Sequence, residues 1–123
     1  MNSIIKTVNL SKSFFLKKKL NILKKINVDI KKGQLIGLLG PSGSGKSTFL
    51  HLIALLDKPS KGEIYFLGKK TSQMNSVEKD ELRSKKISMV YQQNNLLSDF
   101  SALENVVLAV IASGKPKEKA NVE

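Results

Sequence analysis

The chain has 123 residues, a hydrophobic fraction of 41%, no cysteine and a formal net charge of +11 at pH 7. This size and composition fit one modest globular domain with a buried core, and the lack of cysteine excludes disulfides and thiolate metal sites. No apolar run reaches the ~20 residues that cross a bilayer, and the first ten residues show no secretory signal. We therefore expect a soluble chain that meets a membrane only through a partner.

The excess positive charge has two interpretations. It either binds nucleic acid or an anionic membrane surface, or it consists of lysines that are simply solvated at the surface. Nucleic-acid readers use arginine for bidentate contacts and interleave aromatic residues for stacking. Arg83 is the only arginine in the sequence, and no such aromatic pattern is present. We therefore favour solvated lysines and expect no nucleic-acid partner.

The first third of the chain predicts β-strands. Ile4–Leu10 is a first candidate, and Ile22–Ile30 alternates apolar and polar residues as a half-buried strand does. Phe14–Asn21 between them predicts a loop or hairpin, and Lys31–Gly33 a turn. Glu63–Leu67 predicts a further strand. We expect these strands to form an antiparallel β portion.

The middle of the chain predicts a strand, a loop and a helix in succession. Leu35–Leu39 is a short apolar run, typical of a strand that is buried on both faces of a parallel sheet. A glycine-rich loop follows, and Lys46–Leu56 has apolar residues at helical spacing until Asp57–Gly62 ends the helix. This order indicates an α/β fold of the P-loop NTPase type.

The remaining residues predict two helices and one more buried strand. Ser76–Arg83 predicts a short helix with its first serine as the cap, and Ile87–Tyr91 a short apolar strand. A helix from Ala102 to about Ser113 begins with a capping box, in which Ser101 and Glu104 cap each other.

The glycine-rich loop fits the phosphate-binding pattern G-x-x-x-x-G-K-[ST]. Its nine residues are Gly40, Pro41, Ser42, Gly43, Ser44, Gly45, Lys46, Ser47 and Thr48. Glycine lets the backbone fold around a phosphate with N–H groups aimed inward, and the helix that follows adds its N-terminal dipole. The pattern predicts that Lys46 reaches the β- and γ-phosphates of a nucleotide and that Ser47 places its hydroxyl on Mg²⁺. A flexible turn would not need Lys-Ser-Thr at this offset.

The residues around this loop resemble the first half of an ATP-binding-cassette (ABC) ATPase. Leu10–Phe14 is similar to the segment whose aromatic side chain stacks on adenine. Phe14 is the matching position and Phe15 the alternative, and stacking suits a base face because it needs no polar readout. A core aromatic is the competing interpretation of Phe14.

Met89–Gln93 resembles the Q-loop of the same family. Gln92 matches the glutamine that helps to bind Mg²⁺ and the attacking water, and Gln93 is its neighbour. The resemblance implies ATP and Mg²⁺ as cofactors. It makes Lys46 and Gln92 the catalytic residues and Ser47 and Gln92 the metal ligands.

Two stretches, His51–Pro59 and Asn95–Val106, resemble the ABC ATPases that release lipoproteins from the bacterial inner membrane. Macrolide exporters and cell-division ATPases share much of this sequence and remain alternatives. His51 has no cysteine or histidine partner, so we expect it to be structural.

The resemblance also implies partners and a location. Membrane subunits would dock near the Q-loop, at Gln92–Ala112, and a second ATPase subunit would complete a head-to-tail dimer on the cytoplasmic face of the inner membrane. The expected docking patch is apolar and exposed. Its residues are Leu96, Leu97, Phe100 and Leu103.

The resemblance covers residues 1–123 but only about half of the family's domain. The sequence contains no Leu-Ser-Gly-Gly-Gln signature, no apolar strand ending in Asp-Glu (Walker B and the general base) and no switch histidine. We expect a partial nucleotide-binding domain, either a shortened gene product or part of a longer protein. Alone, it should bind ATP weakly and not hydrolyse it, because phosphoryl transfer needs the missing groups.

Missing strands also predict poor stability. In the family's sheet, strands that arrive later in the chain lie between the segments that correspond to Leu35–Leu39 and Ile87–Tyr91. Without them both segments would present unpaired edges, which invite aggregation. We expect the chain by itself to be insoluble or molten.

Other functions remain open beside an ABC transport ATPase. A non-enzymatic nucleotide-binding remnant fits the missing catalytic groups. A small kinase should show arginines for its lid, and a GTPase should show an Asn-Lys-x-Asp guanine reader; the sequence has neither.

Overall fold

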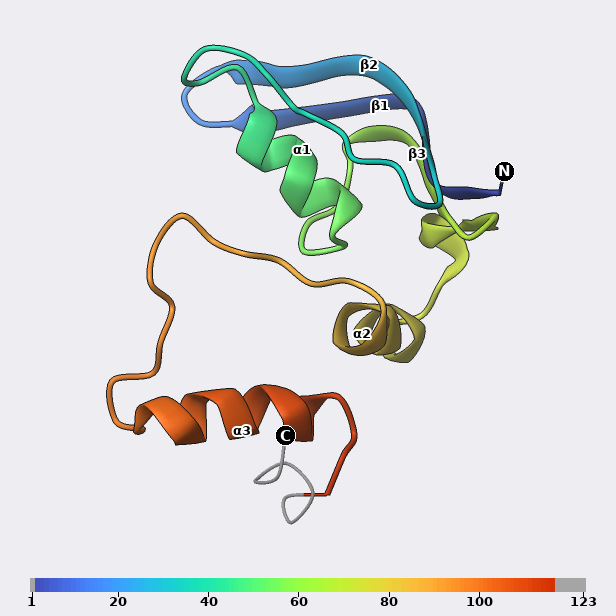
Figure 1. The fold of residues 1–123 in the computed structure, drawn as a ribbon. Helices are drawn as coiled ribbons and strands as arrows, with labels where there is room; N and C mark the ends of the chain where they lie inside the picture. The colour runs from blue at the N-terminus through green and yellow to red at the C-terminus, as the bar shows by residue number, and fades with distance from the viewer. Residues whose placement is uncertain (1, 117–123) are drawn as a thin grey trace. The chain divides into compact units, whose positions relative to one another are not determined.

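The computed structural model describes residues 2–116. They divide into two compact units, Met1–Lys79 and Asp80–Glu123. The first unit holds an antiparallel sheet, helix α1 and the glycine-rich loop, and the second holds most of α2 and all of α3 (Figure 1). None of the described helices is long and apolar enough to cross a membrane.

Four antiparallel strands form the sheet, in the order β2-β1-β3-β4. Their bounds are β1 Ser3–Phe15, β2 Lys19–Lys31, β3 Lys61–Phe66 and β4 Lys69–Lys70. The predicted antiparallel β portion is therefore confirmed. The hairpin is longer than predicted, because strand pairing continues to Phe15 opposite Lys19 and leaves only residues 16–18 as a loop.

The pairing of β1 with β2 is irregular around Asn9 and Lys25, which both have a φ of 48°. Side chains satisfy backbone groups at this bulge. The Thr7 hydroxyl donates to the Ile26 carbonyl at 3.1 Å and accepts from the Val28 N–H at 3.0 Å. Thr7 is buried, so its hydroxyl replaces ladder bonds that the bulge removes.

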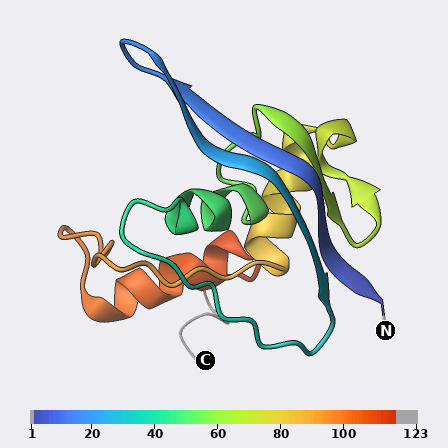
Figure 2. The ribbon, with the colours of Figure 1, turned by 90° about the horizontal axis from the view of Figure 1, so that it is seen from above.

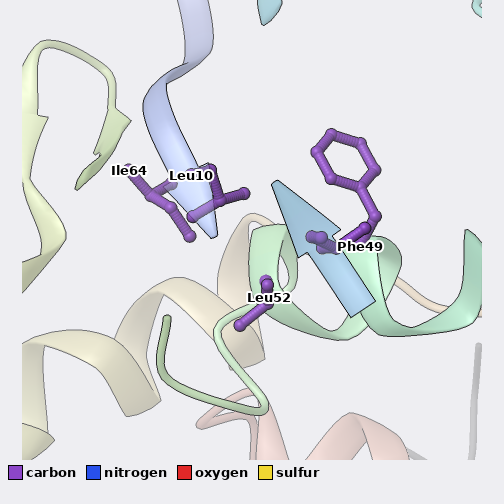
Figure 3. Packing of buried hydrophobic residues seen from close by; sticks show 5 residues of the cluster. Leu10, Phe49, Leu52 and Ile64 are labelled. Carbon is purple, nitrogen blue, oxygen red and sulfur yellow. The ribbon is translucent and has the colours of Figure 1, made fainter. Parts of the chain in front are cut away.

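Helix α1 (Lys46–Ile53) lies against one face of the sheet (Figure 2). The core between them is apolar, and each buried side chain of this size stabilises the fold by about 1.5–3 kcal/mol. It consists of Leu10 from β1, Leu23 from β2, Ile64 from β3, and Phe49 and Leu52 from α1 (Figure 3).

Helix α1 ends three residues earlier than the predicted Leu56. Leu55 has a φ of 60°, a left-handed conformation that stops the helix. The N–H of Leu55 donates to the carbonyl of Leu52 at 3.1 Å, and that of Leu56 to His51 at 2.9 Å. This is the pair of bonds that closes a Schellman motif, with leucine where glycine is usual.

The predicted strands Leu35–Leu39 and Ile87–Tyr91 are wrong. Neither segment is part of a strand, and the side chains of Leu35, Leu39 and Val90 are almost fully exposed. A β-strand needs hydrogen bonds to a neighbour, and within residues 2–116 no strand pairs with either segment. Both segments are thus apolar but unpaired, as expected for strands without neighbours among the described residues.

Helix α2 (Ser76–Lys85) follows the short 3₁₀ turn η1 (Thr71–Gln73). The prediction that Ser76 caps α2 is wrong, because Asn75 does so. The N–H of Glu78 donates to Asn75 Oδ1 at 2.9 Å, and the N–H of Asn75 donates to Glu78 Oε2 at 3.0 Å. Asn75, and not Ser76, has the spacing from Glu78 that a capping box requires.

Helix α3 (Ala102–Ala112) confirms its predicted start. The N–H of Glu104 donates to the Ser101 hydroxyl at 3.2 Å, and the N–H of Ser101 donates to Glu104 Oε2 at 2.8 Å. The predicted capping box is present, and its carboxylate also suits the positive end of the helix dipole.

Candidate phosphate-binding site

The glycine-rich loop leads directly into the first turn of α1. Gly45 is the N-cap and makes no side-chain capping bond, and the first turn contains no acidic residue. The N–H groups that lack a partner within the helix and the helix dipole therefore favour an anion at this end. Ser47 is exposed in the same turn, so its hydroxyl is accessible from solvent.

Gly45 is required for two reasons. Its φ of 95° is left-handed, and a Cβ added to it would lie 2.9 Å from Leu23 Cδ2 and 3.0 Å from Ile22 Cγ2. The loop thus packs closely against β2 before it enters the helix. Gly40 is restricted as well, because a Cβ there would lie 2.7 Å from the Ser44 hydroxyl.

Lys46 extends across this loop. Its ammonium donates to the carbonyls of Gly40 at 2.6 Å and Pro41 at 2.8 Å, and it lies 3.4 Å from the Ser44 hydroxyl. The N–H of Ser44 donates to the Pro41 carbonyl at 3.2 Å, which closes the loop on itself. The loop therefore holds the Lys46 ammonium at the start of α1, a position that suits a phosphate oxygen.

Phe14 lies on β1 opposite Leu20 of β2. Two residues further along β2 is Ile22, which contacts Gly45 of the loop, so Phe14 and the phosphate loop flank the same part of β2. The Phe14 ring remains 40% exposed and lies outside the buried core, whereas Phe15 is far more exposed. Among the described residues Phe14 is thus better placed than Phe15 to offer a supported ring face.

Gln92 lies in the second unit, in an exposed bend between α2 and α3. Because Ser47 belongs to the first unit, the predicted Mg²⁺ site of Ser47 and Gln92 stays a prediction, as does the catalytic pairing of Lys46 with Gln92. The side chains of the expected docking patch are all exposed, as a docking surface requires. They are Leu96, Leu97, Phe100 and Leu103. Docking at this patch stays a prediction.

Asn105, which was not predicted from the sequence, holds the segment before α3 in place. Its Oδ1 accepts from the Leu97 N–H at 2.8 Å, and its Nδ2 donates to the carbonyls of Leu97 and Phe100 at 3.2 Å and of Ser101 at 2.9 Å. The signal available was an asparagine one helical turn after a serine cap. Asn105 thereby orders the loop that carries the exposed apolar patch.

Lys12 was also missed. Its Nζ lies 2.7 Å from Asp57 Oδ2, donates to the Lys58 carbonyl at 2.7 Å, and lies 5.0 Å from the centre of the Phe14 ring. The hydrogen bond from Lys12 holds the pKa of Asp57 below its ordinary value, against a smaller opposing effect of burial. The hydrogen bond from the Lys58 N–H to the Asp57 carboxylate lowers this pKa further.

A family model described as ABC transporter matches residues 23–123 of the chain. The chain belongs to the ABC transporter family. Several curated relatives bear the name Lipoprotein-releasing system ATP-binding protein LolD. The one from Ehrlichia ruminantium (strain Gardel) is 46% identical over 112 residues, which are 90% of this chain and 49% of that protein. The one from Buchnera aphidicola subsp. Acyrthosiphon pisum is 42% identical over 121 residues, or 95% and 52%.

Solved structures of the ATP-binding cassette MJ0796 have the same fold. One, described as a dimeric post-hydrolysis state bound to ADP and Pi, has a TM-score of 0.88 and 37% identity, and the match covers 97% of this chain and 53% of that one. The predicted fold class is confirmed: an ABC-type P-loop fold with an N-terminal antiparallel β portion, represented here in part. The chain spans about half the length of the relatives it matches.

Proposed function

We propose that the chain binds Mg-ATP and forms the N-terminal part of the ATP-binding subunit of an ABC transporter. The observation that carries this proposal is the phosphate loop at the start of α1. There the Lys46 ammonium lies beside the carbonyls of Gly40 and Pro41, and the helix has neither a side-chain N-cap nor an acidic residue in its first turn. On binding, the Lys46 ammonium would exchange these neutral carbonyl acceptors for an anionic phosphate oxygen, which attracts it more strongly.

Each residue has a separate role in this proposal. The loop Gly40–Thr48 holds the triphosphate, and Lys46 places positive charge at its β- and γ-phosphates. Ser47, exposed in the first turn of α1, offers a hydroxyl to Mg²⁺, and Gln92 would be its partner from the second unit. A bound Mg²⁺ would neutralise part of the negative charge of the triphosphate. Phe14 provides an apolar ring for the adenine.

The names of the relatives support a proposal for the transported substrate. Their names describe a lipoprotein-releasing system, so we propose that the subunit energises release of lipoproteins from the bacterial inner membrane. In this setting it works on the cytoplasmic face, pairs with a second ATPase subunit and docks membrane subunits through Gln92–Ala112. The dimeric state of the similar cassette supports the pairing.

Residues 1–123 correspond in this proposal to the β portion, phosphate loop and Q-loop of one nucleotide-binding domain. They contain no signature sequence, Walker B strand or switch histidine. Loss of one oriented electrostatic group costs about 10²–10³ in rate, and several are lost together. The 123-residue chain therefore binds nucleotide without measurable turnover.

The test is a Mg-ATP titration beside a phosphate-release assay. Lys46→Ala should weaken ATP binding at least tenfold, whereas Lys17→Ala, which removes an equal charge from the exposed hairpin loop, should not. None of the three proteins, wild type or variant, should release phosphate above background. Wild-type and Lys46→Ala chains with equal ATP affinity would contradict the proposed binding site, and robust turnover would contradict the assignment of catalysis to groups outside residues 1–123.

A further inference from the structure

Beyond Ser11, no strand among residues 2–116 pairs with β1 on its β3 side. β3 reaches only as far as Lys61, which lies opposite Ser11. The segment 57–60 takes its place. The N–H of Ser60 donates to the Ser11 carbonyl at 2.9 Å, and the Ser60 hydroxyl accepts from the N–H of Ser13 at 3.0 Å and donates to its carbonyl at 3.2 Å. The end of β1 is thus attached to the chain that follows α1.

Lys12 lies at the centre of this attachment. Its side chain is only 11% exposed, so its ammonium has exchanged most of its water for protein partners. They are the Asp57 carboxylate, the Lys58 carbonyl and the Phe14 ring. We call Lys12, Asp57, Lys58 and Ser60 the Lys12 latch.

The latch and the phosphate loop lie at the two ends of the same helix. α1 begins at Lys46 of the loop, and Asp57 follows four residues after its end at Ile53. A short helix is rigid, so fixing β1 to Asp57 also fixes the Phe14 ring relative to the loop. The close contact of Gly45 with β2 fixes the other end.

The ammonium also changes the ring itself. A cation over one face of an aromatic ring draws the ring's electron density toward it. The other face then becomes less negative, which favours stacking by an electron-rich purine. Lys12 therefore acts on Phe14 in two ways, by position and by charge.

We propose that Lys12 is a positioning residue for the base of the bound nucleotide, and that it determines how much the purine adds to the affinity of the triphosphate. This inference rests on the proposed ATP binding and concerns a different part of the ligand. Lys12 contacts neither the phosphate loop nor a group that the loop uses in any described hydrogen bond.

The experiment compares Mg-ATP with Mg-tripolyphosphate, which has the phosphates without the base. Both are titrated calorimetrically into the wild-type chain and its variants. Lys12→Met keeps the aliphatic stem and removes the charge; it should weaken ATP binding about three- to tenfold and leave tripolyphosphate binding unchanged. Asp57→Asn should lower the ratio of ATP affinity to tripolyphosphate affinity by a smaller factor than Lys12→Met does. Lys17→Met is the matched control and should change neither affinity, while Lys46→Ala should weaken both.

A double-mutant cycle separates positioning from simple destabilisation. In a Phe14→Ala chain, Lys12→Met should have no further effect on ATP affinity, because the ring through which it acts is gone. Equal losses for ATP and tripolyphosphate, no loss at all, or additive effects of the two substitutions would each overturn the inference. A wild-type chain that binds neither ligand would instead contradict the proposed function.

Discussion

Two apolar segments of similar length meet opposite fates in this chain. In β3, Ile64 is 1% exposed, because β1 and β4 pair on its two sides and α1 covers its inner face. In Leu35–Leu39, the side chain of Leu35 is 101% exposed and the backbone joins no sheet. β3 (KGEIYF) is the less apolar of the two segments, so its burial follows from its neighbours β1 and β4 and not from its composition.

This difference separates the part of the molecule that forms its own core from the segment that has no packing partner among the described residues. The antiparallel sheet and α1 form a core from residues 10–64. The apolar run before the phosphate loop has the composition of a buried parallel strand but no strand beside it. The phosphate loop stands at the boundary, with β2 packed against Gly45 on one side and the unpaired run on the other.

The largest expected effect is on the buried segment. Ile64→Ala should destabilise the sheet by about 2–5 kcal/mol through lost burial and a cavity. Leu35→Ala should change stability by less than about 0.5 kcal/mol, because the side chain has no packing to lose. Hydrogen exchange at the amides paired between β1 and β3 measures both. Equal effects of the two substitutions would show that Leu35–Leu39 is buried in solution.

The next effect is at the boundary. Gly45→Ala should cost about 1–3 kcal/mol of strain at a left-handed φ and push the loop away from Ile22 and Leu23. ATP binding should fall with it. The control is Gly33→Ala, also at a positive φ but outside the loop and with no atom within 4 Å of the added Cβ. If Gly33→Ala weakened ATP binding as much, the contact with β2 would not be the cause.

A smaller change should improve the exposed segment. Leu35→Lys places charge on an unpaired apolar edge, a substitution that natural sheets use against aggregation. We expect a higher soluble yield with stability changed by less than about 0.5 kcal/mol. The yield after centrifugation, compared with that of Lys32→Leu as the opposite change nearby, measures this. An unchanged yield would mean that aggregation starts elsewhere.

The smallest effect is the acid sensitivity of the Lys12 latch. The pKa of Asp57 is lower in the folded chain than its ordinary value of about 4, so its ion pair stabilises the fold above that pH. This contribution is lost as the pH falls below about 4 through the folded pKa, and for a partly exposed pair it is at most about 1 kcal/mol. On acidification, the Ser13 amide should therefore lose less protection against hydrogen exchange in Lys12→Met than in the wild type. The same loss in both proteins would contradict this role of the ion pair.

The sequence predicted those features that depend on local signals. The phosphate loop, the capping box at Ser101 and the hairpin strands follow from residue type and spacing over a few positions. The strand prediction for Leu35–Leu39 failed because an apolar run indicates burial without saying what buries it. Lys12 and Asp57 lie far apart in the sequence, and no local pattern joins them.

The most direct test of the central claim is hydrogen–deuterium exchange with and without Mg-ATP. With Mg-ATP we expect slower exchange at the amides of Gly43–Phe49 and near Phe14, where phosphates and base are proposed to bind. The amides of Leu35–Leu38 should keep exchanging fast, because the nucleotide supplies them with no partner strand. Protection confined to the second unit, or no protection at the loop, would contradict the account.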